Sequence, residues 1–317
     1  MKIAVYLSGV PRKSKNEFKR DILTRFAHGA KLAGDEVYLV TQDEPVECDV
    51  AVLQGWIGMK TGAHLEVRRR VIKQQRRSNG HTLAMDSNLF GFLEPADFNR
   101  YLRYSLDDVF PDTGYYFDRD PDLQRWQRIK AHYGFAERGW SNNGRNILVA
   151  LQRNGGWSMG DVPVQQWLDT LLPQIRQHTD RPIVIRPHPG NLAIVPTIQL
   201  PSVAQVAWST QQDIREDLNQ TWATVTYNSS PGVASILWGV PAFVTDPRPA
   251  KSQAWPWASN NIAEIESPRR GDRQEFYTKL AQCHWSSEEI SSGEAWRFMR
   301  QRLPKIPCQY PTLLFNP

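Results

Sequence analysis

The sequence predicts an α/β protein made of two doubly wound domains, each with a mostly parallel sheet and helices on both faces. Short buried-strand patterns alternate with amphipathic helical patterns over residues 2–86, and the same alternation returns over residues 146–244. Between these two stretches the alternation stops. A length of 317 residues has room for two domains of ordinary size.

The N-terminal half begins with an apolar strand pattern, Lys2–Leu7, which ends at Ser8-Gly9. A helix is predicted over Glu17–Leu32 because apolar residues recur there every four positions, and Gly34 ends it. Short strands joined through helices imply right-handed crossovers and a parallel sheet. The remaining elements predicted in this half are strands over Glu36–Val40, Val50–Leu53 and Leu83–Met85, and a helix over Gly62–Gln75.

Residues 107–145 do not show the alternation of strand and helix patterns. Within them, the Gly-, Ser- and Asn-rich segment 139–144 is the best candidate for a connection between domains. A last helix over Ser287–Arg302 has acids in its first turn, where they suit the helix dipole. We expect an N-terminal domain over 1–140, a C-terminal domain over 146–286, and a helix with a tail over 287–317. The alternation over residues 146–244 predicts strands at Asn146–Leu151, Pro182–Ile185, Ala223–Thr226 and Ala242–Val244, with helices at Pro163–His178 and Gly232–Trp238.

Composition excludes several classes of protein. The hydrophobic share of 40% and the charged share of 22% are those of a soluble globular protein. No apolar run approaches eighteen residues, so we expect no membrane span. Cys48, Cys283 and Cys308 are odd in number and scattered, which argues against a disulfide framework or a zinc site. We therefore expect a cytoplasmic protein with no metal, and the sequence indicates no obligate protein partner.

The positive charge is concentrated in one predicted helix. The net charge is +5, whereas residues 1–80 alone carry 15 Lys and Arg against 9 Asp and Glu. This helix is either a solvated face or a docking surface for a polyanion such as DNA. Its basic residues lie within 64–77, against the single acid Glu66: Arg68, Arg69, Arg70, Lys73, Arg76 and Arg77.

Two polar segments follow predicted strands of the C-terminal half, at the sheet edge where open α/β proteins bind ligands. The first, Arg153-Asn154-Gly155-Gly156, combines a cation with a flexible turn that lets the backbone approach a ligand. The second is Arg186-Pro187-His188-Pro189. Its prolines stiffen the backbone around an imidazole that can donate to a phosphate oxygen. The plain alternatives are an ordinary turn and a structural histidine.

A third segment, Asn228-Ser229-Ser230-Pro231-Gly232, opens a predicted helix. One serine suffices to cap the helix, with proline at its first position. Two hydroxyls at the positive end of a helix can also bind an anion. Together the three segments predict a site for a phosphate-bearing ligand formed by Arg153, Asn154, Gly155, Arg186, His188, Ser229, Ser230 and Gly232.

These segments together resemble the nucleotide-binding half of a GT-B glycosyltransferase. The His-Pro and Ser-Ser signatures are similar to those of bacterial sialyltransferases, Kdo-transferases and teichoic-acid polymerases. The run Leu151–Met159 together with Trp285–Trp296 is similar to glycosyltransferases encoded by bacteriophages.

The GT-B resemblance implies two Rossmann-like domains that face each other across a cleft. It implies that the C-terminal helix crosses back to the N-terminal domain. The implied co-substrate is a nucleotide sugar, which we expect to be UDP-linked, with no tightly bound cofactor and no catalytic metal.

One acidic motif of the sialyltransferases, Asp/Glu-Asp/Glu-Gly, is missing from the N-terminal half, which argues against a sialic-acid or Kdo donor. Our candidate for the catalytic base is Asp86, because it follows the short strand Leu83–Met85 and a carboxylate there could take a proton from an acceptor hydroxyl. The alternative is that Asp86 caps the following turn. His64 and Glu94 are further candidates.

The sequence thus favours a glycosyltransferase that moves a sugar from a nucleotide sugar to an acceptor hydroxyl. The phage resemblance makes a 5-hydroxymethylpyrimidine base in DNA, such as 5-hydroxymethylcytosine, the favoured acceptor, with the enzyme in the host cytoplasm. The basic helix would contact phosphates and the base would flip out of the duplex. The alternatives are a glycosyltransferase of cell-surface polysaccharide synthesis, a non-catalytic nucleic-acid-binding protein and a sugar-nucleotide epimerase.

Overall fold

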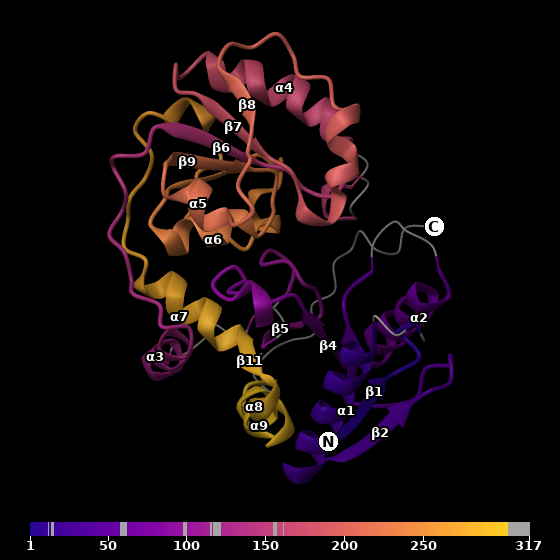
Figure 1. Ribbon diagram of the computed structural model, residues 1–317. Coiled ribbons are helices and arrows are strands. Elements are labelled where there is room, and N and C mark those ends of the chain that lie inside the picture. The colour runs from indigo at the N-terminus through magenta and orange to yellow at the C-terminus, as the bar shows by residue number, and fades with distance from the viewer. Residues whose placement is uncertain are drawn as a thin grey trace. The chain divides into compact units, whose positions relative to one another are not determined.

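The computed structural model describes residues 1–11, 13, 16–57, 62–97, 100–114, 116, 122–154, 157–160 and 162–303. The chain forms two compact units, unit 1 (Met1–Ile129 with Thr278–Pro317) and unit 2 (Lys130–Tyr277) (Figure 1). The boundaries fall within helices α3 (Leu123–His132) and α7 (Gln274–Cys283). Segment 139–144 lies inside unit 2, where the Ser141 N–H donates to the Gly239 carbonyl at 2.7 Å.

Unit 1 is built on a six-stranded sheet. Its strands are β1 (Lys2–Tyr6), β2 (Glu36–Val40), β3 (Val50–Gln54), β4 (His81–Asp86), β5 (Tyr101–Leu106) and β11 (His284–Ser286). They lie in the order β11-β5-β4-β3-β1-β2. Strands β1, β2, β3 and β4 are parallel, whereas β5 runs antiparallel to β4 and β11 antiparallel to β5.

Helices cover both faces of this sheet. Because side chains alternate along a strand, Ile3 and Val5 point to one face and Ala4 to the other. The first face packs with α1 (Glu17–Leu32) in a single buried cluster. The helix α2 (Ala63–Ser78) packs on β3 and β4 and is not part of that cluster. The doubly wound arrangement expected for the N-terminal half is confirmed.

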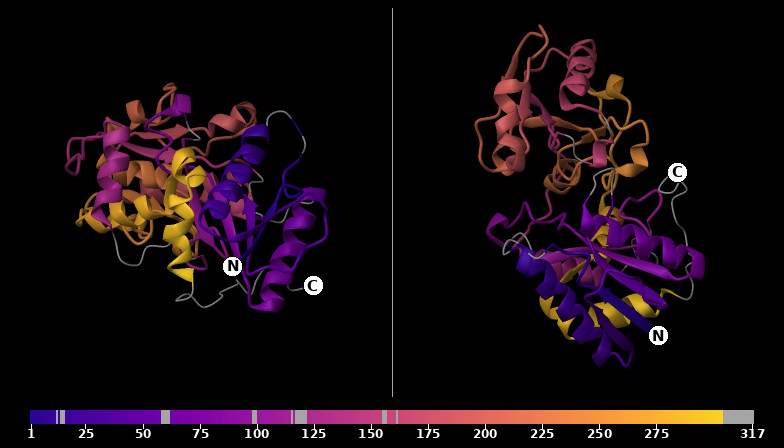
Figure 2. Two further views of the ribbon diagram at one scale, coloured as in Figure 1. Left: turned by 90° about the horizontal axis from the view of Figure 1, so that it is seen from below. Right: turned by 90° about the vertical axis from the view of Figure 1, so that its right-hand side faces the viewer.

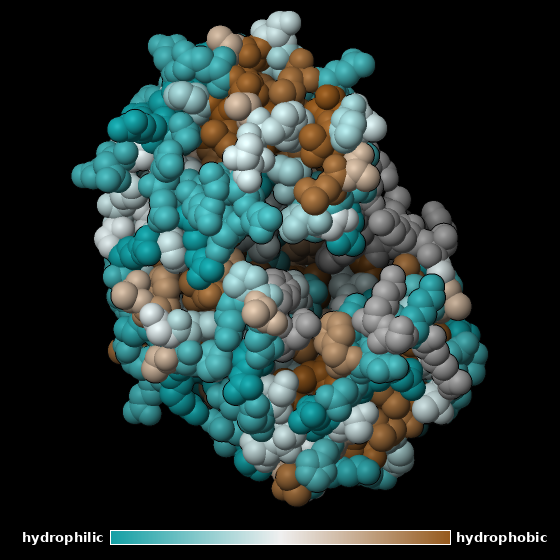
Figure 3. All heavy atoms as spheres, viewed as in Figure 1, coloured by the Kyte–Doolittle hydropathy of each residue, from teal (hydrophilic) through white to brown (hydrophobic). Residues whose placement is uncertain are grey.

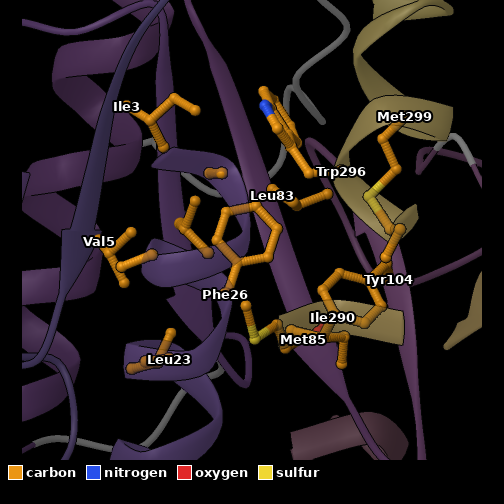
Figure 4. Close-up of a cluster of buried hydrophobic side chains, with 14 of the residues drawn as sticks. Ile3, Val5, Leu23, Phe26, Leu83, Met85, Tyr104, Ile290, Trp296 and Met299 are labelled. Carbon is orange, nitrogen blue, oxygen red and sulfur yellow. The ribbon is translucent and has the colours of Figure 1, made fainter. Parts of the chain in front are cut away.

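The end of the described chain returns to α1. One helix was expected over Ser287–Arg302, but there are two, α8 (Ser287–Ser291) and α9 (Glu294–Arg300), because the backbone turns at Gly293 with φ +78°. The Trp296 ring meets the Phe26 ring edge-on at 5.5 Å between centroids, and Met299 and Ile290 complete this part of the core (Figure 4). The expected return of the C-terminal helical segment to the N-terminal domain is confirmed.

Unit 2 is a parallel sheet of five strands in the order β10-β9-β6-β7-β8. Buried side chains of α4 form a core with one face, whereas α5 and α6 contact β9 (Figure 2). The elements are β6 (Asn146–Ala150), α4 (Val164–Arg176), β7 (Ile183–Arg186), β8 (Val206–Trp208), α5 (Ile214–Leu218), β9 (Thr221–Thr226), α6 (Pro231–Trp238) and β10 (Ala242–Val244).

Sequence patterns missed several elements. All six residues of β5 are buried, including Arg103 and Ser105, so the strand shows neither an apolar run nor alternation. Strands β8 and β11 have three residues each, too few to show a period. The pattern that defined the longer parallel strands was therefore absent from these three.

The surface gives two general findings. On the face shown in Figure 3, the exposed side chains of both units are mostly hydrophilic. No helix among the described residues has the length and apolar character needed to cross a membrane.

A buried histidine in β11 makes the stability of unit 1 depend on pH. The Nδ1–H of His284 donates to the Leu280 carbonyl at 2.6 Å, and the Leu89 N–H donates to Nε2 at 3.1 Å. One ring nitrogen thus donates a hydrogen bond and the other accepts one, which is possible only for the neutral imidazole. Burial lowers the pKa of His284 from 6.5 to about 3.

His284 binds a proton near pH 6.5 in the unfolded chain but only near pH 3 in the folded protein. The contribution of His284 to the unfolding free energy is therefore fully present above pH 6.5 and is lost as the pH falls towards 3. We expect the urea midpoint of a His284→Asn variant to fall less steeply between pH 6.5 and pH 4 than that of the parent. A His28→Asn variant, changed at an exposed position of α1, should keep the parental slope. An unchanged slope in His284→Asn would contradict this assignment.

Candidate functional site

The carboxyl edge of the unit 2 sheet contains the topological switch point of that sheet. From β6 the chain continues through α4 to β7 on one side, whereas from β9 it continues through α6 to β10 on the other. Open α/β sheets bind ligands in the crevice where neighbouring strands diverge in this way. The segments that leave β6 and β9 here are residues 151–154 and 227–230, two of the three segments singled out in the sequence.

A buried polar network joins these two segments. The Asn228 backbone N–H donates to Gln152 Oε1 at 2.8 Å. The Asn228 side-chain amide donates to the Ser158 carbonyl at 2.8 Å and to Asp246 Oδ2 at 2.7 Å. Because buried polar groups are costly unless they are paired, this network fixes the loops after β6, β9 and β10 relative to one another.

His188 lies after β7 with its ring in a defined state. The Gly190 N–H donates to Nδ1 at 2.9 Å, so the ring proton is on Nε2. Burial and the charge of Arg153 lower the pKa of His188, which keeps the ring neutral at pH 7. A Cβ atom on Gly190 would lie 2.5 Å from Arg153 Nη2, so the guanidinium rests on this glycine. The structure therefore brings Arg153 and His188 together.

The start of α6 adds groups that suit an anion. The Ser229 hydroxyl oxygen is buried and, within the described part of the chain, has no hydrogen-bond partner. Ser230 is the exposed N-cap residue, and its side chain does not cap the helix. A positive helix end with an unsatisfied hydroxyl beside it favours a negatively charged oxygen.

Arg186 does not provide a free charge at this edge. Its Nη1 pairs with Asp217 Oδ2 at 2.6 Å and donates to the Gln211 carbonyl at 3.0 Å, while Nη2 donates to the Gln212 carbonyl at 2.6 Å. The guanidinium is therefore occupied in joining β7 to the segment around α5. Its charge is thus compensated by Asp217 in this structure, and direct binding of a phosphate by Arg186 stays a prediction.

The remaining predicted residues of this edge have local roles. Asn154 Oδ1 accepts from the Val164 N–H at 3.2 Å and so caps α4. Gly232 is needed for close packing, because a Cβ there would meet the Ala254 side chain at 3.2 Å. Gly155 lies outside the described residues.

Two residues of this edge were missed by the sequence analysis. Asp246 follows β10 and is buried in the network, and Arg248, whose side chain is 56% exposed, donates its backbone N–H to Asp246 Oδ1 at 2.9 Å. Both could have been found by the same rule that identified the segments after the other strands. Polar residues that directly follow a predicted strand, here Ala242–Val244, belong to the same edge.

In unit 1, Asp86 lies at the carboxyl end of β4. Its Oδ2 accepts from Arg103 Nη2 at 2.7 Å, and its Oδ1 accepts from the Ser87 N–H at 2.8 Å. Both carboxylate oxygens therefore have partners, and the second contact is the one that the turn-cap alternative requires. Of the other candidate bases, His64 lies in the first turn of α2, and Glu94 immediately precedes the 3₁₀ turn Pro95–Asp97.

The basic helix divides into buried, paired and exposed residues. Arg68 is buried, and its Nε and Nη2 donate to the Gly9 carbonyl at 3.0 and 2.8 Å, while Nη1 donates to the Trp56 carbonyl at 2.9 Å. Burial lowers its pKa to about 10. The structure thus removes Arg68 from the predicted docking surface. Arg69 pairs with Glu66 and Arg70 with Glu44. Lys73, Arg76 and Arg77 are exposed and form a basic stripe on the helix.

Within the described ranges, no group of three or more His, Cys, Asp or Glu side chains is placed to hold a metal ion. The geometry of the unit 2 edge instead suits an anionic ligand held by hydrogen bonds.

No protein-family model and no curated protein matches the chain. Two solved structures of KpsC from Thermosulfurimonas dismutans are similar to it. The one described as a β-Kdo 2,4-transferase is 14% identical, with a TM-score of 0.53 over 88% of this chain and 90% of that one. The one described as a β-Kdo 2,7-transferase is 12% identical, with a TM-score of 0.51 over 94% of this chain and 99% of that one. The chain therefore has the GT-B-like two-domain α/β fold that its motifs indicated.

Proposed function

We propose that the protein is a glycosyltransferase that takes its sugar from a nucleotide sugar, with UDP as the expected nucleotide. The observation that carries the proposal is the anion-accepting edge of unit 2. There Arg153, the neutral Nε2–H of His188 and the unsatisfied Ser229 hydroxyl lie on segments that meet at the switch point of the sheet. The fold shared with two KpsC structures described as Kdo transferases supports this class of reaction.

In this proposal the unit 2 edge stabilises the leaving group. Transfer breaks the bond between the sugar and the terminal phosphate oxygen, so negative charge grows on the nucleotide. Preorganised donors aimed at that oxygen lower the barrier more than they tighten substrate binding. Arg153 supplies a permanent charge, and His188 and Ser229 supply neutral donors. Arg186 acts only by holding β7 in place. Asp86 stays the candidate base, because its carboxylate is 25% exposed at the end of β4.

The acceptor we propose first is a glycan hydroxyl of the kind used in cell-surface polysaccharide synthesis. KpsC, described as a Kdo transferase, supports a carbohydrate acceptor by analogy. The reduced positive surface of α2 points the same way, since Arg68 is buried and Arg69 and Arg70 have acidic partners. A hydroxymethylated base in phage DNA is the second candidate, and the exposed basic stripe favours it.

Two alanine variants test the nucleotide site. We expect His188→Ala and Arg153→Ala each to weaken binding of UDP or another nucleoside diphosphate about tenfold, because each removes a hydrogen bond to a charged phosphate. Isothermal titration calorimetry provides the measurement. The controls are His178→Ala and Arg145→Ala, which remove the same side chains from exposed positions at the amino edge of the same sheet. Equal affinities in test and control variants would reject the proposed site.

The acceptor is identified by product analysis with a panel of nucleotide sugars. Oligosaccharides, hydroxymethylated DNA and plain DNA are offered separately, and the products are read by mass spectrometry. A sugar transferred to oligosaccharides supports the first candidate, and one transferred only to hydroxymethylated DNA supports the second. An altered nucleotide sugar with no acceptor product would mean an epimerase, and DNA binding with no turnover would mean a non-catalytic protein.

A further inference from the structure

Unit 1 contains a cavity of about 300 Å³ that the proposed nucleotide site does not use. This volume is at the lower end of the range found for small-ligand sites, about 300–1,000 Å³. The cavity opens where β1 and β2 end and α2 begins, beside the point where α1 and α2 leave for opposite faces of the sheet. The cavity is therefore next to the switch point of unit 1, between β1 and β3, and a doubly wound sheet binds ligands at such a point.

The lining combines two kinds of side chain. Leu7, Val10, Pro11 and Ala63 give an apolar wall, and Ser8, Arg20, Thr41, Asp43 and His64 give polar groups. Such a mixture suits a ligand that presents both C–H groups and hydroxyls, as a sugar ring does.

Two of the polar groups have unused hydrogen-bonding capacity. The Ser8 hydroxyl oxygen is buried and has no hydrogen-bond partner among the residues that the structure describes. Arg20 donates from Nη1 to the Leu7 carbonyl at 2.8 Å, and this is the only hydrogen bond that its guanidinium makes to the described chain. The remaining N–H groups of Arg20 can therefore bind a ligand anion.

The charge around the cavity is mostly positive. The charges of Arg68, Lys19 and Lys13 act on His64 and, together with its burial, lower its pKa. The first turn of α2, a helix of 16 residues with no side-chain cap, presents its positive end at Ala63 and His64. Among the lining residues that the structure describes, Asp43 is the only acid.

The wall is held rigidly by a buried side chain. Arg68 joins the Gly9 carbonyl, after β1, to the Trp56 carbonyl, after β3. Because this guanidinium holds the backbone at Gly9, between the lining residues Ser8 and Val10, that part of the wall is already in place, which lowers the cost of binding.

We propose that this cavity binds a small sugar that carries one anionic group, a carboxylate or a phosphate, with Arg20 on the anion and Ser8 and His64 on neighbouring oxygens. Its use as the acceptor site rests on the proposed function. The binding itself does not, since every residue involved lies in unit 1.

Calorimetry on the whole chain tests the proposal with three probes: glucuronate, glucose 6-phosphate and glucose. We expect at least one of the two anionic sugars to bind at least tenfold more tightly than neutral glucose. Comparing the affinities for glucuronate and glucose 6-phosphate shows whether the cavity prefers a carboxylate or a phosphate. Arg20→Gln should weaken that binding at least tenfold. The control Arg25→Gln removes an arginine from α1 whose partner is Asp21 and which does not line the cavity. Ala63→Trp should abolish binding by filling the cavity.

Failure of both anionic sugars to bind more tightly than glucose, or equal affinities in Arg20→Gln and Arg25→Gln, would overturn the proposal. The same preparations are titrated with UDP, which reports on unit 2. If UDP binds and the anionic sugars do not, only the cavity proposal is lost. If the anionic sugars bind and no nucleotide does, the cavity stands and the proposed function is lost.

Discussion

Replacing Arg125 by alanine is expected to lower the unfolding free energy by about 3 to 5 kcal/mol, the usual cost of breaking a buried ion pair. Its two terminal nitrogens pair with the two Glu289 oxygens at 2.8 and 2.9 Å, and its Nε donates to the Ala281 carbonyl at 2.9 Å. The guanidinium also lies 3.5 Å from the centre of the Trp285 ring. This single side chain thus connects α3 to the returning C-terminal segment.

The loss is large because Glu289, whose side chain is only 16% exposed, would keep its charge without its closest partner. Burial acts to raise the pKa of Glu289, and the hydrogen bonds and charge of Arg125 outweigh it and hold that pKa below its usual value. Urea denaturation gives the measurement. The control is Arg128→Ala, on the same helix, whose side chain is 54% exposed, pairs with Glu294 at 2.9 Å and lies farther from Glu289, at 3.9 Å. An exposed pair of this kind contributes about 0 to 1 kcal/mol.

A double variant separates the ion pair from the loss of packing. Replacing Arg125 by methionine and Glu289 by leucine removes both charges and retains apolar volume, so we expect it to regain much of the stability lost in Arg125→Ala. If Arg125→Ala costs no more than Arg128→Ala, the ion pair does not anchor the return of the chain.

Gly29→Ala is expected to destabilise unit 1 by about 3 kcal/mol, the upper part of the usual range for overpacking. Helix propensity alone predicts the opposite sign, since alanine in a helix interior is about 1 kcal/mol better than glycine. A Cβ on Gly29 would lie 2.0 Å from the Ile290 carbonyl oxygen, which belongs to the backbone of α8 and cannot rotate away. α8 and α9 would have to move away from α1.

The matched control is His28→Ala, one residue earlier on the exposed side of α1, where helix propensity should act alone and stabilise slightly. Urea midpoints of the two variants and the parent give the comparison. A Gly29→Ala variant as stable as the parent would mean that α8 does not depend on this close approach.

The parts of the fold that the sequence predicted are those with a strong period. The parallel strands β1 and β6 are apolar runs, and α1 repeats its apolar residues along one face. The antiparallel strand β5 could not be predicted in this way, because Arg103 and Ser105 are buried within it. Arg103 is tolerated there because Asp86, on the neighbouring strand β4, pairs with it, and no local pattern reveals that partner.

For the candidate site, the sequence predicted the position but not the role of each side chain. Its position after β6 and β9 followed from the rule that polar residues at strand ends mark a ligand edge, and the structure places both segments at one switch point. The sequence did not predict which side chains at this edge are available to a ligand and which are paired within the protein. Arg153 and Arg186 look alike in the sequence, yet one rests beside His188 and the other is neutralised by Asp217, a residue 31 positions away.

By itself the sequence determined the fold class and the sheet edge at which the polar segments gather, because these depend on residue periods and on where strands end. Only the tertiary structure decided which charges are free. The availability of a guanidinium depends on the carboxylates and carbonyls that the fold brings to it, as Arg68 and Arg186 show. It also decided that Ser8 and Arg20 share a cavity, since that requires β1, β2 and α2 to be packed together first.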